Sequence, residues 1–139
     1  MRSLFVVGMV VLQFATCSQY DAYREYIASN DRSNTTAPQN YKAEILALMR
    51  NYLNDPTQVR DAYISDPVIK QIDGGNRYIV CMRYNAKKSD GKYAGSKDVI
   101  ATFREGRLNH LIDPPSREAR DQCKDVPMQP FTELQKLTR

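Results

Sequence analysis

The three cysteines are the residues whose type and spacing suggest the clearest chemistry in this chain of 139 residues. Cys17 directly follows an apolar stretch from Leu4 to Phe14, and Arg2 precedes that stretch. A positive start, a short apolar run and an abrupt polar end are typical of a secretory signal. The run is also shorter than the roughly 20 apolar residues that cross a bilayer. We therefore expect residues 1–17 to be an export signal, with a buried N-terminal helix or strand as the alternative.

Cys17 ends the segment Phe14-Ala15-Thr16-Cys17, which resembles the lipobox of bacterial lipoproteins. The resemblance implies that Cys17 carries acyl chains, which anchor a protein by about 0.8 kcal/mol per buried methylene. Phe14 and Thr16 stand where the pattern prefers Leu and a small residue. Ordinary cleavage after Cys17 is therefore the alternative. If Cys17 is lipidated, the membrane is the first partner that the sequence suggests, through an N-terminal lipid anchor.

Lipidation or removal of Cys17 leaves Cys81 and Cys123, two cysteines 42 positions apart. In an exported protein a disulfide between them is the default expectation. It would close a loop that contributes about 4 kcal/mol by the chain-entropy model. The alternative is a buried thiol at Cys81, which lies in an apolar run. Two cysteines at this spacing and the single His110 do not form the paired ligands of a zinc site, so we predict no metal and no cofactor.

Catalytic patterns are difficult to find in the sequence. His110 is the only histidine, and the Gly-x-Ser-x-Gly elbow of a serine hydrolase does not occur. The glutamates at candidate surfaces and turns have no apolar context that would raise their pKa toward that of a general acid. These are Glu44, Glu105, Glu118 and Glu133. We predict a non-enzymatic protein, with a hydrolase of unrecognised site as the least favoured alternative.

A basic loop is the one surface feature that suggests binding. It runs from Lys87 to Lys97 and contains Lys87, Lys88, Lys92 and Lys97 around Tyr93. Such a group could contact anionic lipid headgroups, lipopolysaccharide, peptidoglycan carboxylates or an acidic protein surface. A solvated hairpin tip is the alternative. The net charge of +4 is too small and too dispersed to predict nucleic-acid binding.

The elements that must position these residues follow from hydrophobic periodicity. Apolar residues at helical spacing predict a helix from Tyr41 to Leu53, and Pro56 follows it. The stripe consists of Tyr41, Ile45, Leu48, Met49 and Tyr52. Residues 18–39 are polar and predict a tether, which leaves residues 40–139 as a single domain.

Alternating and apolar runs predict the strands of an antiparallel sheet. They are Gln58–Ser65, extended by Val68–Ile72, then Arg77–Ala86, Asp98–Arg104 and Arg107–Ile112. Both faces of Arg77–Ala86 are apolar, so this strand should be central. In the tail, Phe131, Leu134 and Leu137 recur at the spacing of a short helix. We predict an α+β fold with one amphipathic helix packed on a three- to four-stranded antiparallel sheet and a disulfide-stapled C-terminal tail.

Length and composition agree with one globular domain, since 42% of residues are hydrophobic and 26% charged. The chain also resembles a family of small envelope lipoproteins of rhizobia and related alphaproteobacteria. The segments that carry the resemblance are Arg77–Lys87, Tyr93–Gly95, Phe103–Leu108, Cys123 and Phe131–Leu134. The resemblance implies export and a disulfide, and the family has no assigned activity to transfer.

We therefore predict an exported, envelope-anchored, non-enzymatic interaction or structural module of the bacterial cell envelope. It would face the periplasm or belong to the outer membrane as a lipoprotein. The alternative is a soluble secreted inhibitor or effector that acts through the basic loop at residues 87–97.

Overall fold

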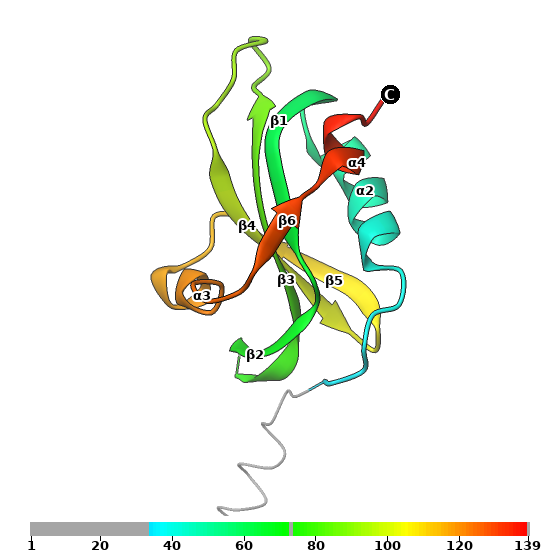
Figure 1. Cartoon of the computed structure of the whole chain (residues 1–139), viewed down its shortest axis with the longest axis vertical. Helices are drawn as coiled ribbons and strands as arrows, with labels where there is room; N and C mark the ends of the chain where they lie inside the picture. The colour runs from blue at the N-terminus through cyan, green and yellow to red at the C-terminus, as the bar shows by residue number, and fades with distance from the viewer. Residues whose placement is uncertain (1–33, 73, 139) are drawn as a thin grey trace, which may run out of the picture. The chain divides into compact units, whose positions relative to one another are not determined.

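The computed structural model describes residues 34–72 and 74–138 (Figure 1). The predicted export signal, Cys17 and residues 18–33 lie outside the described residues. The elements follow one another as α2 (Tyr41–Tyr52), β1 (Asp55–Ser65), β2 (Val68–Ile72), β3 (Gly75–Lys87), β4 (Lys97–Arg104), β5 (Arg107–Ile112), α3 (Arg117–Asp121), β6 (Met128–Pro130) and α4 (Thr132–Gln135).

The predicted α+β class and the antiparallel sheet are confirmed, but the sheet is larger than predicted. Over the described residues it has six strands in the order β5-β4-β3-β1-β6, and β2 also pairs with β3. β2 continues the pairing of β1 along β3, because Ile64 lies opposite Met82 and Val68 lies opposite Ile79. The two strands therefore act as one interrupted strand, as the expected extension by Val68–Ile72 implied.

The interruption between β1 and β2 falls at Asp66 and Pro67, and a side chain restores the hydrogen bonding there. The hydroxyl of fully buried Ser65 accepts a hydrogen bond from the backbone N–H of Cys81 over 2.9 Å. It also donates to the carbonyl of Asp66 over 2.8 Å. Because a buried backbone N–H is costly without an acceptor, Ser65 keeps β3 paired across the break.

The prediction of three or four strands was wrong mainly because it missed β6. Three residues are too few for a visible alternation, and prolines at positions 127 and 130 disfavour a strand. The position of β6 is fixed by the residues on either side of it. Cys123 is bonded to Cys81, and fully buried Phe131 donates its N–H to the carbonyl of Ala62 over 2.8 Å.

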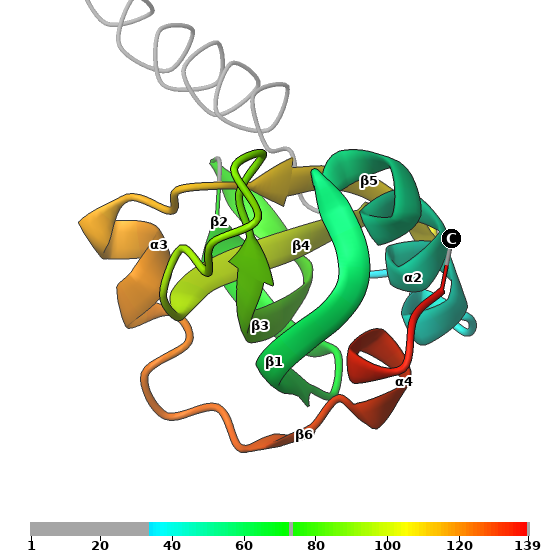
Figure 2. The same cartoon turned by 90° about the horizontal axis from the view of Figure 1, so that it is seen from above.

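Helices cover both faces of the curved sheet (Figure 2). α2 and α4 lie on one side, where Ile45, Met49 and Leu134 pack with core-facing residues of β3 and β4. α3 lies on the other side, where Ala119 packs near Ile79 and Cys81. β3 is buried on both faces, as its sequence predicted. Phe131, Leu134 and Leu137, whose spacing predicts a short helix in the tail, are all buried.

The predicted disulfide is present and joins Cys81 on β3 to Cys123 after α3, with their Cα atoms 5.9 Å apart. It therefore staples the tail to the central strand on the face opposite α2. Export remains a prediction.

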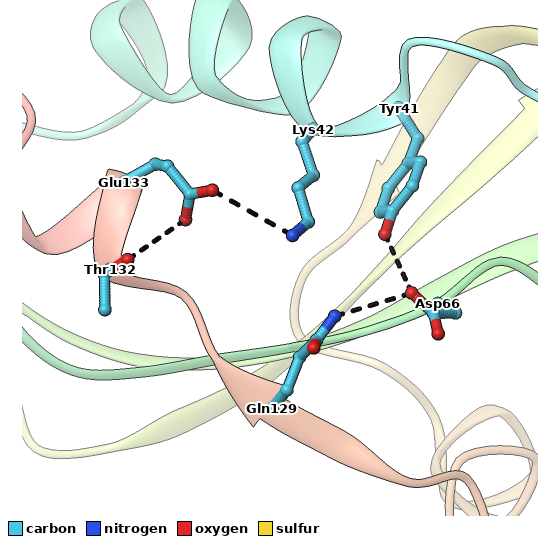
Figure 3. Close-up of polar contacts among 6 residues, drawn as sticks. All are labelled: Tyr41, Lys42, Asp66, Gln129, Thr132 and Glu133. Carbon is cyan, nitrogen blue, oxygen red and sulfur yellow. Dashed lines mark hydrogen bonds and ion pairs between the residues drawn. The ribbon is translucent and has the colours of Figure 1, made fainter.

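Polar contacts fasten the start of α2 to the C-terminal segment (Figure 3). The Tyr41 hydroxyl donates to a carboxylate oxygen of Asp66 over 3.0 Å, and the Gln129 amide donates to the same oxygen over 3.4 Å. Lys42 lies 3.9 Å from the carboxylate of Glu133 on α4. Burial, followed by the hydrogen bond to Asp66, raises the pKa of Tyr41 to about 12. These contacts link the start of α2 to Asp66, β6 and α4.

The last residues of the predicted tether pack against the domain. The backbone N–H of Asn34 donates to the carbonyl of Asn76 over 2.6 Å, and the Asn34 side chain accepts the N–H of Glu105 over 2.8 Å. Pro38 is buried. Residues of the predicted tether therefore contact the domain at Asn34 and Pro38.

Candidate functional site

A hollow of about 310 Å³ opens beside the C-terminal end of α2 and the connection between β3 and β4. Lysine side chains line it together with aromatic and aliphatic ones. It is lined by Tyr52, Leu53, Asn54, Tyr84, Ala86, Lys87, Lys88, Ala94, Gly95 and Lys97. Three of the five residues predicted to bind a partner, namely Lys87, Lys88 and Lys97, therefore meet at one concave surface.

The hollow arises because the sheet continues past the end of the helix. Tyr84 on β3 lies directly opposite Lys97 on β4, and this pair ends a row of core-facing residues that includes Met82 and Val99. α2 ends at Tyr52, and the chain is extended at Leu53, two residues ahead of Asp55-Pro56. Lys97 therefore occupies a core-facing position where the helix no longer covers the sheet.

Lys97 is held by a partly buried carboxylate. Its amine donates to Oδ2 of Asp113 over 2.6 Å, and the Tyr52 hydroxyl donates to the same oxygen over 2.5 Å. Partial burial by itself raises the pKa of Asp113, but the hydrogen bonds from Lys97 and Tyr52 outweigh it, so the pKa lies below its ordinary value. The bond to Asp113 and burial raise the pKa of Tyr52 to about 12.

Tyr84 contributes an unusual polar atom to this region. Its side chain is fully buried, and its hydroxyl has no hydrogen-bond partner among the described residues. Burial, together with the nearby Asp113 and Tyr52, raises the pKa of Tyr84 above its ordinary value. The amine of Lys97 lies 5.5 Å from the centre of the Tyr84 ring and 6.0 Å from that of Tyr52, within the range of a cation–π contact.

Tyr93 and Lys92, the other two residues of the predicted surface, do not line the hollow. Tyr93 does not project from the tip. Its ring lies under the guanidinium of Arg60 at 4.0 Å, and its hydroxyl donates to the carbonyl of Gln58 over 2.8 Å. Lys88 lies 3.8 Å from a carboxylate oxygen of Asp90. Lys92 is exposed and makes no ion pair with any described residue.

The loop is folded back onto β1 and is not a long open connection. The Lys88 N–H donates to the carbonyl of Lys92 over 2.8 Å, and the Ala94 N–H donates to the carbonyl of Ala86 over 3.0 Å. Lys87 donates to the side-chain oxygen of Gln58 over 2.5 Å. Gln58 itself has a φ of 57°, in the left-handed region that non-glycine residues rarely adopt, next to a register shift in β1.

Sequence reasoning missed four residues of this region: Tyr52, Gln58, Tyr84 and Asp113. The two tyrosines belong to apolar patterns that predict core residues, and Asp113 directly follows the predicted strand Arg107–Ile112. The available signal was weak, because only the fold brings a helix end, a bulge and a strand end together. A pair of tyrosines at the ends of an apolar helix and an apolar strand was the one hint.

Other candidate features are less concentrated. His110 lies exposed on β5, at one edge of the sheet. A second hollow of about 420 Å³ lies beside the disulfide, where Arg83 and Asp98 form an exposed ion pair over 2.8 Å. Within residues 34–72 and 74–138, no three His, Cys, Asp or Glu side chains are grouped as a metal site would require. Over the same ranges, no helix has the length and apolar character needed to cross a membrane.

Comparisons of the chain with protein-family models, with curated proteins and with solved structures find no match.

Proposed function

We propose that this protein is an exported, envelope-anchored binding module that holds an anionic component of the bacterial envelope through its loop lysines, without covalent chemistry. The observation that carries the proposal is the gathering of Lys87, Lys88 and Lys97 around one hollow. The Cys81–Cys123 bond supports an oxidising compartment, since disulfides persist mainly in exported proteins. The signal-like residues 1–17 and Cys17 supply the proposed route to the envelope.

Charge distribution supports an anionic partner. The chain has eight lysines, and half of them fall within the eleven residues from Lys87 to Lys97. The acidic residues near them, Asp90 and Asp113, each pair with a single lysine. A concentration of like charge on one surface attracts an opposite partner over about one Debye length, roughly 8 Å at physiological salt. The partner should therefore bear carboxylate or phosphate groups.

The test is sedimentation of the full chain carrying Cys17→Ser, so that no attached lipid contributes to binding. The probes are vesicles of phosphatidylglycerol in phosphatidylcholine and purified peptidoglycan sacculi. We expect replacement of Lys87, Lys88, Lys92 and Lys97 by Gln to weaken binding at least tenfold at low salt. A triple variant that retains Lys97 keeps the test valid if the quadruple variant unfolds.

A matched control removes the same charge elsewhere. The other four lysines are Lys42, Lys70, Lys124 and Lys136, and replacing all of them by Gln should leave binding within about twofold of that of the parent chain. Equal loss of binding in the two variants would show that net charge, and not the loop, accounts for binding. Absence of binding to both probes would contradict the proposed function.

The alternative of a soluble secreted inhibitor is favoured by one observation. The loop is fixed to β1 by Tyr93 and Lys87, and a loop held in one conformation loses less entropy on entering a partner's site. Recovery of the protein unmodified in the medium of its host would favour this alternative over the anchored module.

A further inference from the structure

We propose that the hollow beside Lys97 is a small-molecule site for one carboxylate or phosphate group, gripped by Lys87, Lys88 and Lys97 and hydrogen-bonded by the Tyr84 hydroxyl. This inference rests on the proposed function, because it uses three of the same lysines. Beyond the proposed function, it names the class of ligand and assigns a role to Tyr84, which attraction between charges alone would not require.

The lining of the hollow matches a small amphipathic anion. Positive side chains line the hollow together with the apolar surfaces of Tyr52, Leu53 and Ala86. A volume of about 310 Å³ lies at the small end of the range for ligand pockets, roughly 300–1,000 Å³. The size suits a sugar acid or a glycerol phosphate group and is too small for a folded partner, so a polymer or a lipid would enter by one terminal group.

Tyr84 is the residue that points to a ligand and not merely to a basic surface. Buried hydroxyls are nearly always hydrogen-bonded, yet that of Tyr84 has no partner among the described residues. Phe would fill the same position without desolvating a polar atom, so core packing does not explain the hydroxyl. A ligand oxygen that accepts its hydrogen bond explains why the hydroxyl is there.

Lys97 controls access to that hydroxyl. It is the cross-strand partner of Tyr84, and its amine lies over the Tyr84 ring. The Lys97 side chain is 44% exposed, whereas its partner Asp113 is 9% exposed. Lys97 can therefore rotate toward solvent while Asp113 stays in place. An incoming anion competes with Asp113 for the Lys97 ammonium and, by drawing it outward, uncovers Tyr84.

Asp113 is then a positioning residue with a measurable cost to binding. It keeps Lys97 at the site in the empty protein, but its negative charge opposes a bound anion. Asp113→Asn retains an acceptor for Tyr52 and removes the charge, so it should bind anions more tightly. A role for Asp113 that is only structural would predict the opposite, because loosening the site weakens binding.

The experiment is calorimetric titration of the full chain carrying Cys17→Ser with glycerol 3-phosphate and with D-glucuronate, at constant ionic strength set by sodium chloride. We expect saturable binding of at least one probe. Tyr84→Phe should weaken it at least fivefold and, by removing the unpaired hydroxyl, should leave the melting temperature equal or higher. Tyr78→Phe, on the same core-facing side of β3 but outside the hollow, should leave binding unchanged.

The outcomes separate this inference from the proposed function. If Tyr84→Phe binds both probes as well as the parent does, or if neither probe binds saturably, the inference is overturned even when vesicles or sacculi still sediment the protein. Failure of sedimentation alone would overturn the proposed function and leave the small-anion site standing. Competition between phosphatidylglycerol vesicles and glycerol 3-phosphate would identify a lipid headgroup as the source of the anion. Absence of such competition would identify a free anion as the ligand.

Discussion

The ammonium group of Lys97, at the start of β4, donates to Asp113, just beyond the end of β5, over 2.6 Å. The Tyr52 hydroxyl reaches the same carboxylate oxygen from the end of α2. One carboxylate therefore joins two strands and a helix next to Tyr52 and Lys97, which line the hollow. The ion pair differs from an ordinary surface pair, because Asp113 is 9% exposed and is shielded from solvent.

The first prediction concerns acid stability. Because the folded-state pKa of Asp113 is depressed, its contribution to stability is present above its unfolded pKa, about 3.8, and is lost as the pH falls through the lower folded value. We expect the difference in free energy of unfolding between the parent and Asp113→Asn to shrink on acidification below about pH 4. Chemical denaturation between pH 7 and pH 2 measures this. A difference in free energy of unfolding that stays constant from pH 7 to pH 2 would contradict a stabilising role for ionised Asp113.

The second prediction concerns the alkaline side. The pKa of Tyr52 is raised from 10.0 to about 12, so its contribution is fully present below pH 10 and is lost as the pH rises through 12. We expect Tyr52→Phe to be less stable than the parent at neutral pH, by about 1 kcal/mol, because Asp113 loses a donor. The deficit should disappear toward pH 12. Because the pKa values of Tyr41 and Tyr84 are also raised, ultraviolet titration of the folded protein should show one fewer tyrosine ionising well above pH 10 in the variant than in the parent.

The third prediction concerns the disulfide. The bond between Cys81 and Cys123 closes a loop with a sequence separation of 42, and loss of a native disulfide from a small domain costs about 2–5 kcal/mol. We expect reduction to lower the melting temperature by about 10 °C or more. The double variant Cys81→Ala, Cys123→Ala should have a melting temperature close to that of the reduced protein, and reductant should not change it. Two thiols open to alkylation in the folded, air-oxidised protein would contradict the bond.

The fourth prediction concerns how the helix holds an edge strand. Glu44 on α2 accepts the backbone N–H of Leu108 over 2.6 Å and lies 2.7 Å from the guanidinium of Arg107. Glu44 is 20% exposed but Arg107 is 80% exposed, so the backbone bond should dominate. Glu44→Ala should therefore cost about 1–2 kcal/mol, because the Leu108 N–H loses its acceptor. Arg107→Ala should cost less than about 0.5 kcal/mol in the same denaturation experiment. Equal costs would assign the stability to the ion pair.

Local patterns were sufficient to predict the elements that bury a complete face. The helix beginning at Tyr41 and the doubly buried strand around Val80 each carry enough apolar residues at one period to determine their type. The pairing of Cys81 with Cys123 followed from the even cysteine count that remains without Cys17, combined with the expectation of export. β6 was missed, because a three-residue strand is held by pairing with β1 and by its flanks and not by its own pattern.

The candidate site was predictable only in its charges. A run of lysines in the sequence indicated a basic surface, but not that Tyr93 folds back under Arg60 while Lys97 turns toward Asp113. Those contacts depend on strand register, a bulge at Gln58 and the length of α2 relative to the sheet. None of these is encoded within one short segment. Among the four loop lysines, Lys97 should contribute most to stability, since it neutralises a shielded carboxylate.

The last prediction concerns the anchor, which lies outside the described residues. Cys17 stands at the end of an apolar segment that is too short to span a bilayer, so stable attachment to a membrane would need an added lipid. We expect intact-mass analysis of the protein from its host to show an acylated N-terminus at Cys17. Cys17→Ser should shift the protein from the membrane fraction to the soluble fraction. The loop variant that replaces Lys87, Lys88, Lys92 and Lys97 by Gln is the control, and it should remain membrane-bound, because acyl chains and not surface charge hold it there. Recovery of the parent protein as an unmodified soluble chain would exclude the anchor and favour the secreted alternative.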